Sequence, residues 1–142
     1  MTAVHLHDHG DLLRQDAIRA AVRQVYGGVP ATDGEVARRF YAPSELADLP
    51  EDVVGMALGV GTPVRHAGLR PGEHVVDLGS GGGIDCLIAG RAVGPSGAVV
   101  GVDFLPEMVD RATRSAADAG LRNVRFVEGL IESLPCRPGG RM

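Results

Sequence analysis

The strongest constraint on the fold is a glycine-rich segment, DLGSGGG at residues 77–83. It lies between a short apolar run at 75–78, which is typical of a strand, and a helical pattern at 83–92. Open α/β sheets bind ligands at the carboxyl ends of their strands. Glycines there let the backbone approach a ligand, and the next helix presents free N–H groups and a positive dipole end. One glycine alone would indicate only a turn, but this set predicts a ligand-binding loop.

Strand and helix patterns continue to alternate after this loop. A turn at 95–97 precedes a buried strand at 98–102, and Pro106 opens a helix, as proline does at the first helical position. Gly120 closes that helix, and a third strand follows at 124–127. Strands separated by helices of this length predict an α/β fold with a Rossmann-like parallel sheet and right-handed crossovers.

The first half of the chain has a different pattern. Apolar positions at helical spacing predict a helix at 11–25, which the glycines at 27–28 end. Prolines interrupt residues 29–70, where we expect short helices near 33–40 and 44–48 joined by loops, in a covering segment rather than a sheet. We divide the single domain into a flexible His-containing tail (1–10), a helical amino-terminal cap (11–70), a ligand-binding βαβαβ segment (71–135) and a tail (136–142).

Composition and charge argue against several classes of function. A net charge of −4, with basic residues that are all Arg and are scattered along the chain, argues against nucleic-acid binding. No apolar run approaches the roughly 20 residues that span a bilayer, so we expect no membrane partner and a cytoplasmic location. The two cysteines form no disulfide framework. His5, His7 and His9 could share one face of an extended chain, but we interpret them as a solvated tail and predict no metal site.

The spacing of the glycines bears on the identity of the ligand. The dinucleotide fingerprint G-x-G-x-x-G fails in both frames, because its third glycine would fall on Ile84 or Cys86. A nicotinamide-binding module is therefore the disfavoured alternative. The segment instead resembles the D-x-G-x-G-x-G loop of S-adenosylmethionine-dependent methyltransferases. Asp103 supports this resemblance, since it ends the second strand about 20 residues after the loop, where a carboxylate can accept hydrogen bonds from both ribose hydroxyls.

The resemblance implies S-adenosyl-L-methionine as the cofactor and gives the residues their roles. Asp77 would hold the loop and, through it, the methionine amino end of the cofactor. Phe104 and Met108 would contact the adenine. The full cofactor-binding set that we expect is Asp77, Gly79, Ser80, Gly81, Gly83, Asp103, Phe104, Met108, Leu130 and Ile131.

A narrower resemblance, to arsenite methyltransferases, covers most of residues 16–135. The matching segments are 41–46, 58–63, 69–73, 83–86, 101–108, 120–124 and 129–135. The resemblance implies an enzyme that transfers a methyl group from S-adenosylmethionine to arsenite or another small acceptor. Such enzymes work largely by positioning, so we name no general base.

The chain also departs from the arsenite methyltransferase pattern. That family holds trivalent arsenic with cysteine thiolates, yet Val60 occupies a position where it commonly has cysteine. Cys86 matches a family cysteine and is our candidate thiol ligand; the alternative is a small apolar residue on a buried helix face. Cys136 falls outside the pattern. Leu130 replaces an acid that would bind the adenine amine, which leaves Glu132 as a displaced substitute.

The expected fold is only the amino-terminal half of a class I methyltransferase, because the sequence supplies three strands. We hypothesise a truncated product, or the loss of a stretch with the fourth strand. The first strand would then be a sheet edge with unpaired backbone groups, which predicts self-association or a partner chain. The alternative function is a non-catalytic remnant that binds the cofactor or pairs with another chain.

Overall fold

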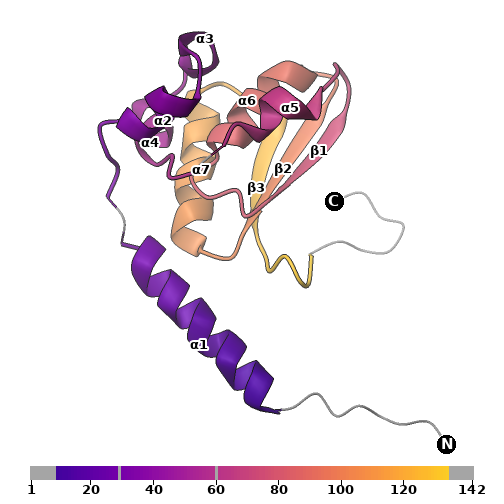
Figure 1. The fold of residues 1–142 in the computed structure, drawn as a ribbon. Helices are drawn as coiled ribbons and strands as arrows, with labels where there is room; N and C mark the ends of the chain where they lie inside the picture. The colour runs from indigo at the N-terminus through magenta and orange to yellow at the C-terminus, as the bar shows by residue number, and fades with distance from the viewer. Residues whose placement is uncertain (1–8, 29, 60, 135–142) are drawn as a thin grey trace, which may run out of the picture.

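The structure is a computed structural model that describes residues 9–28, 30–59 and 61–134 of the 142-residue chain. Ten elements follow one another along the chain (Figure 1). They are α1 (His9–Tyr26), α2 (Glu35–Phe40), α3 (Pro43–Leu46), α4 (Glu51–Gly55), α5 (Pro63–Ala67), β1 (His74–Leu78), α6 (Ile84–Val93), β2 (Ala98–Asp103), α7 (Pro106–Asp118) and β3 (Val124–Glu128).

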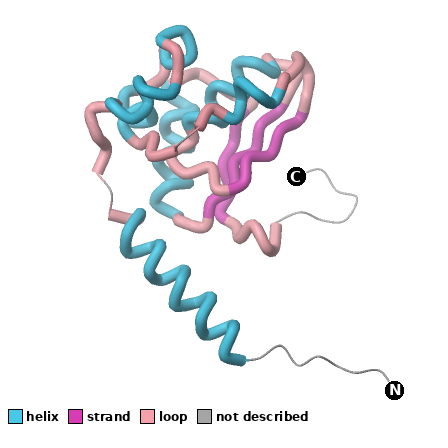
Figure 2. Tube along the Cα trace, in the orientation of Figure 1, coloured by secondary structure: helices cyan, strands magenta, loops and turns pink. Residues whose placement is uncertain are grey.

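The three strands form one parallel sheet in the order β1-β2-β3 (Figure 2). Val76 of β1 lies opposite Val100 of β2, which in turn lies opposite Arg125 of β3. Helix α6 connects β1 to β2, and helix α7 connects β2 to β3. The predicted α/β fold with a parallel sheet is thereby confirmed, and the carboxyl ends of all three strands lie at one edge.

The core lies between the sheet and the helices α6 and α7. Leu87 and Val93 of α6 are fully buried against Val99 of β2, and Phe126 of β3 belongs to the same cluster. Phe126 lies directly beneath the glycine loop, because a Cβ atom built on Gly83 would be 2.6 Å from its ring. Close packing of the loop on the sheet therefore requires glycine at this position.

The amino-terminal segment covers the helices rather than joining the sheet, as predicted. The expected helices at 33–40 and 44–48 correspond to α2 and α3, while α4 and α5 were not foreseen as separate elements. Val53 and Val54 of α4 are buried in the main core. Helix α1 stands apart from these layers (Figure 1), with Ile18 56% and Val25 63% exposed.

Most of the two predicted tails, including His5, His7 and Cys136, lies outside the described residues. Helix α1 begins at His9, so the last two residues of the predicted amino-terminal tail are helical. In the described ranges no three His, Cys, Asp or Glu side chains form a group that could hold a metal ion. No helix in those ranges is long and apolar enough to cross a membrane.

Candidate cofactor-binding site

The glycine loop adopts a conformation that requires glycine at three positions. Gly79, Gly81 and Gly83 have φ values of 77°, 53° and 91°, in the left-handed region that side chains other than glycine disfavour. The amides of Gly79 and Ser80 donate to the carbonyl oxygen of Val102, at 2.8 and 3.0 Å. The loop is thus held against the end of β2, and the next helix begins at its last glycine.

Asp103 joins the loop to the start of α7. One carboxylate oxygen accepts a hydrogen bond from the amide of Gly81 at 2.8 Å, and the other accepts one from the amide of Leu105 at 2.9 Å. The residue is only 8% exposed. A carboxylate oxygen has two acceptor sites, so each oxygen can still accept a hydrogen bond from a ligand hydroxyl. This geometry suits the predicted contact with a ribose.

A cavity of about 360 Å³ opens above the loop. Its walls include the predicted residues Gly79, Ser80, Gly81, Asp103, Phe104 and Met108. The lining also includes Tyr41 and Asp85, which we did not predict. No Lys, Arg or His is among the described residues that line this cavity, so its charged groups are carboxylates. The cavity therefore favours a ligand with cationic groups.

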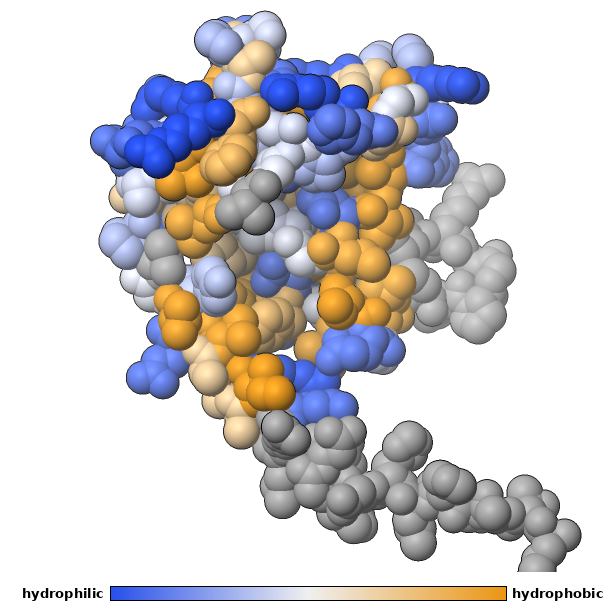
Figure 3. All heavy atoms as spheres, in the orientation of Figure 1, coloured by the Kyte–Doolittle hydropathy of each residue, from blue (hydrophilic) through white to orange (hydrophobic). Residues whose placement is uncertain are grey.

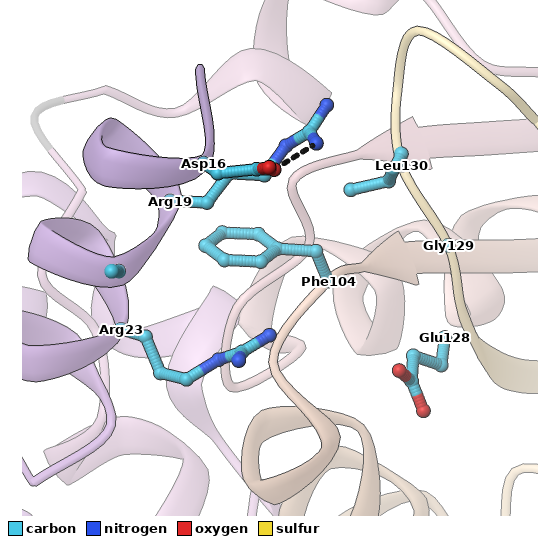
Figure 4. A pocket seen from close by; sticks show the side chains of 8 residues that line it. Asp16, Arg19, Arg23, Phe104, Glu128, Gly129 and Leu130 are labelled. Carbon is cyan, nitrogen blue, oxygen red and sulfur yellow. Dashed lines mark hydrogen bonds and ion pairs between the residues drawn. The ribbon is translucent and has the colours of Figure 1, made fainter. Parts of the chain in front are cut away.

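Phe104 also borders a second opening, between α1 and the end of β3 (Figure 4). Arg19 of α1 bonds to Asp16 at 3.3 Å and to Glu132 at 2.8 Å. Glu132 was the proposed substitute for the acid that would bind the adenine amine. Its carboxylate instead forms an ion pair that connects α1 to the segment after β3. Leu130 lies across the opening from α1 in Figure 4.

Two further predicted cofactor residues lie beside this second opening. Leu130 and Ile131 line a smaller space that Phe104 and Asp103 also border. Ile131 is 58% exposed. The structure therefore brings the predicted residues from Gly79 to Ile131 around the carboxyl ends of β1, β2 and β3.

Asp77 and Gly83 are the predicted cofactor residues that line none of these spaces. Gly83 is buried at the start of α6, against Phe126. Asp77 lines a separate space beneath α5. Its carboxylate accepts a hydrogen bond from the Cys86 thiol, with an oxygen–sulfur distance of 3.3 Å. Burial raises the pKa of this carboxyl group. Among the described contacts, the amides of the loop donate to Val102 and Asp103, and the hydrogen bond of Asp77 joins β1 to Cys86 of α6.

The Cys86 thiol, our candidate arsenic ligand, is fully buried on α6. Burial, together with the neighbouring Asp77 carboxylate, raises the pKa of this thiol above its ordinary value. A thiolate is the form that binds soft metals and metalloids. The environment of Cys86 therefore matches the alternative that we weighed, a small buried side chain on the inner face of a helix.

Tyr41 and Asp85 form a pair that sequence analysis missed. The Tyr41 hydroxyl lies 3.0 and 3.1 Å from the two carboxylate oxygens of Asp85 and donates to this group. Burial raises the pKa of Asp85 to about 6, with smaller contributions from Asp77 and Glu45, while the bond from Tyr41 lowers it. Both residues fall in segments that carry the family resemblance, but 44 positions separate them, and only the folded chain joins them.

The fold, the glycine loop and the carboxylate at the end of β2 together define a class I methyltransferase type of cofactor domain. The methyltransferase domain family matches residues 69–139, half of the chain, and the chain belongs to this family. S-adenosyl-L-methionine is accordingly the expected cofactor.

Two curated relatives are arsenite methyltransferases. An arsenite methyltransferase from Halobacterium salinarum is 46% identical over 98 residues, which cover 69% of this chain and 25% of that protein. One from Aquipseudomonas alcaligenes is 43% identical over 70 residues, 46% of this chain and 20% of that protein. The chain thus spans about a quarter or less of the length of these curated relatives.

Among solved structures, an arsenic(III) S-adenosylmethionine methyltransferase from Chlamydomonas reinhardtii superposes with a TM-score of 0.54. It is 33% identical, and the match covers 63% of this chain and 31% of that one. The resemblance to arsenite methyltransferases is thereby confirmed.

Proposed function

We propose that the chain binds S-adenosylmethionine in the cavity above the glycine loop, as the cofactor half of an enzyme that methylates arsenite or another small acceptor. The observation that best supports this proposal is the hydrogen bond from the Gly81 amide to the Asp103 carboxylate, because both residues line that cavity. Left-handed glycines leave room for the ligand on one side of this junction. Phe104 supplies an apolar surface on another side.

The residues present fit this cofactor. Asp103 would accept hydrogen bonds from the ribose hydroxyls, and Phe104 and Met108 would contact the adenine. The absence of cationic side chains from the described lining suits a ligand that carries a sulfonium and an ammonium. Bound S-adenosylmethionine supplies an already activated methyl group, so the contribution of the protein is to orient the cofactor and exclude water.

A second candidate function is cofactor binding without methyl transfer by this chain. Its supporting observation is the state of Cys86, whose buried thiol donates to Asp77 and has a raised pKa. Cys86 is the cysteine that the described residues contain, and a single buried thiol does not provide the thiolate ligands that trivalent arsenic requires.

Calorimetric titration with S-adenosylhomocysteine, with NADH as the control ligand, tests the cofactor assignment. We expect micromolar binding of the first and none of the second. Asp103→Ala should weaken binding strongly, because it removes the ribose acceptor. Failure of the folded chain to bind S-adenosylhomocysteine would contradict the proposal. Methyl transfer from S-adenosylmethionine to thiol-bound arsenite then separates the two candidates, since the second predicts binding without turnover.

A further inference from the structure

Asp85 is the carboxylate that reaches the cavity from the side of α6. It is the second residue of α6 and borders the same space as Gly79, Gly81 and Asp103. Asp77 lines the space beneath α5 and not the cavity above the loop, whereas Asp85 borders both. The two carboxylates that face the cavity therefore lie at different walls, one at the end of β2 and one at the start of α6.

The two carboxylates differ in how much of their hydrogen-bonding capacity is used. Both oxygens of Asp103 accept backbone amides, from Gly81 and Leu105. Within the described residues, Asp85 accepts from the Tyr41 hydroxyl, which carries a single proton. Asp85 consequently retains most of its acceptor capacity, and it forms no ion pair with a cation among the described residues.

Tyr41 fixes the position of this carboxylate. Tyr41 is 5% exposed and directly follows α2, so a packed side chain from another part of the chain holds the Asp85 group. A carboxylate held in this way is preorganised for a charge-assisted hydrogen bond and needs no rearrangement to accept one.

We propose that Asp85, positioned by Tyr41, binds the α-ammonium group at the methionine end of the cofactor. This inference rests on the proposed function. If the ribose binds at Asp103 and the adenine at Phe104, the methionine end would extend along the rest of the cavity, where Asp85 is the other carboxylate of the lining. An ammonium offers three donors and a positive charge to that carboxylate. Asp85 thus takes the role that the sequence had suggested for Asp77.

The test compares two ligands that differ only at the methionine end. S-adenosylhomocysteine carries the ammonium, whereas 5′-methylthioadenosine has the same nucleoside and sulfur but no amino-acid group. Asp85→Asn should weaken binding of S-adenosylhomocysteine about 10-fold or more and change binding of 5′-methylthioadenosine less than about twofold. Tyr41→Phe should show the same selectivity with a smaller loss. The matched control Asp110→Asn removes an exposed charge on α7 and should leave both affinities unchanged.

Each outcome decides the matter. If the wild-type chain binds neither ligand, the proposed function fails and this inference fails with it. If the wild type binds both ligands and Asp85→Asn weakens both equally, or neither, Asp85 does not bind the ammonium while the cofactor assignment stands. Circular dichroism and the midpoint of thermal unfolding verify that the variants fold. Should Asp85→Asn fail to fold, the ratio of the two affinities in Tyr41→Phe decides in the same way.

Discussion

At the scale of single residues, Gly83 shows how a backbone conformation and a packing contact act together. Its φ is 91°, and a Cβ atom there would lie 2.6 Å from Phe126 and 3.0 Å from Ala112. Gly79 has a similar φ of 77°, but a Cβ atom there would meet nothing within 4 Å. A side chain at Gly79 would meet conformational strain alone, whereas a side chain at Gly83 would meet both conformational strain and steric overlap.

Replacing each glycine by alanine should reveal this difference. Gly79→Ala should lower the free energy of unfolding by about 1 kcal/mol, the cost of a left-handed alanine. Gly83→Ala should cost about 2–4 kcal/mol, because overpacking is added to that strain. Urea denaturation measures both values. Equal losses in the two variants would show that the loop moves away from Phe126 at little cost.

Asp85 should make stability depend on pH in the opposite sense to most carboxylates. Its pKa rises from 3.8 in the ordinary state to about 6 in the folded protein. The folded state therefore binds the proton more tightly than the unfolded state, and stability is lost as the pH rises from about 4 to 6. The groups around it, Tyr41, Glu45 and Asp77, include two further acids that oppose its ionisation.

Asp85→Asn should therefore stabilise the protein at pH 7, on the order of 1 kcal/mol once solvent screening is allowed for. The difference from wild type should shrink below pH 4, where both chains are neutral at this position. Thermal unfolding of the two proteins across this range measures the effect. A variant that is less stable than wild type at pH 7 would indicate that the bond from Tyr41 outweighs the cost of burial.

At the scale of elements, α1 differs from the helices that cover the sheet. Ile18 and Val25 are exposed, and the ion pair between Arg19 and Glu132 is a surface pair of a kind that contributes about 0–1 kcal/mol. Val22 lines the cavity above the loop, while Arg19 borders the opening beside Phe104. Helix α1 is thus weakly held at a position next to the proposed cofactor.

Amide hydrogen exchange should therefore be fast in α1 and slow in α6, whose Leu87 and Val93 are fully buried. Addition of S-adenosylhomocysteine should slow exchange in α1 more than in any other helix, because the ligand would fill the space beneath Val22. Protection of α1 equal to that of α6 without ligand would contradict this view of its packing.

At the scale of the whole molecule, β1 is an edge strand of the described sheet. Val76 is 47% exposed and Leu78 is 51% exposed. Figure 3 shows hydrophobic residues gathered on the side of the molecule where β1 lies. Such an edge offers both unpaired backbone groups and an apolar surface to another strand.

We expect the isolated chain to associate as its concentration rises, and Leu78→Lys to reduce this association by placing a charge on the edge strand. Val25→Lys, at an apolar position on α1 that is at least as exposed, serves as the control and should have little effect. Sedimentation velocity over a range of concentrations measures the association. A chain that stays monomeric throughout would refute this expectation.

Local chemistry determined much of this protein. Glycines at 79, 81 and 83, the apolar runs of the strands and Pro106 each specify their own conformation, so the parallel sheet and the loop could be predicted without coordinates. The position of Asp103 at the end of β2, next to the loop, could be predicted as well, because one helix and one strand set its distance from the loop along the chain.

The tertiary structure decided what depends on contacts between distant segments. Asp77 and Asp85 are both acids near the loop. Only the packing of the helices places Asp85 on the wall of the cavity and leaves Asp77 out of it, in the space beneath α5. The bond between Tyr41 and Asp85 joins segments 44 residues apart, and the burial of Cys86 depends on the same core. Side-chain environment is a property of the packed chain, so no local pattern could have assigned these roles.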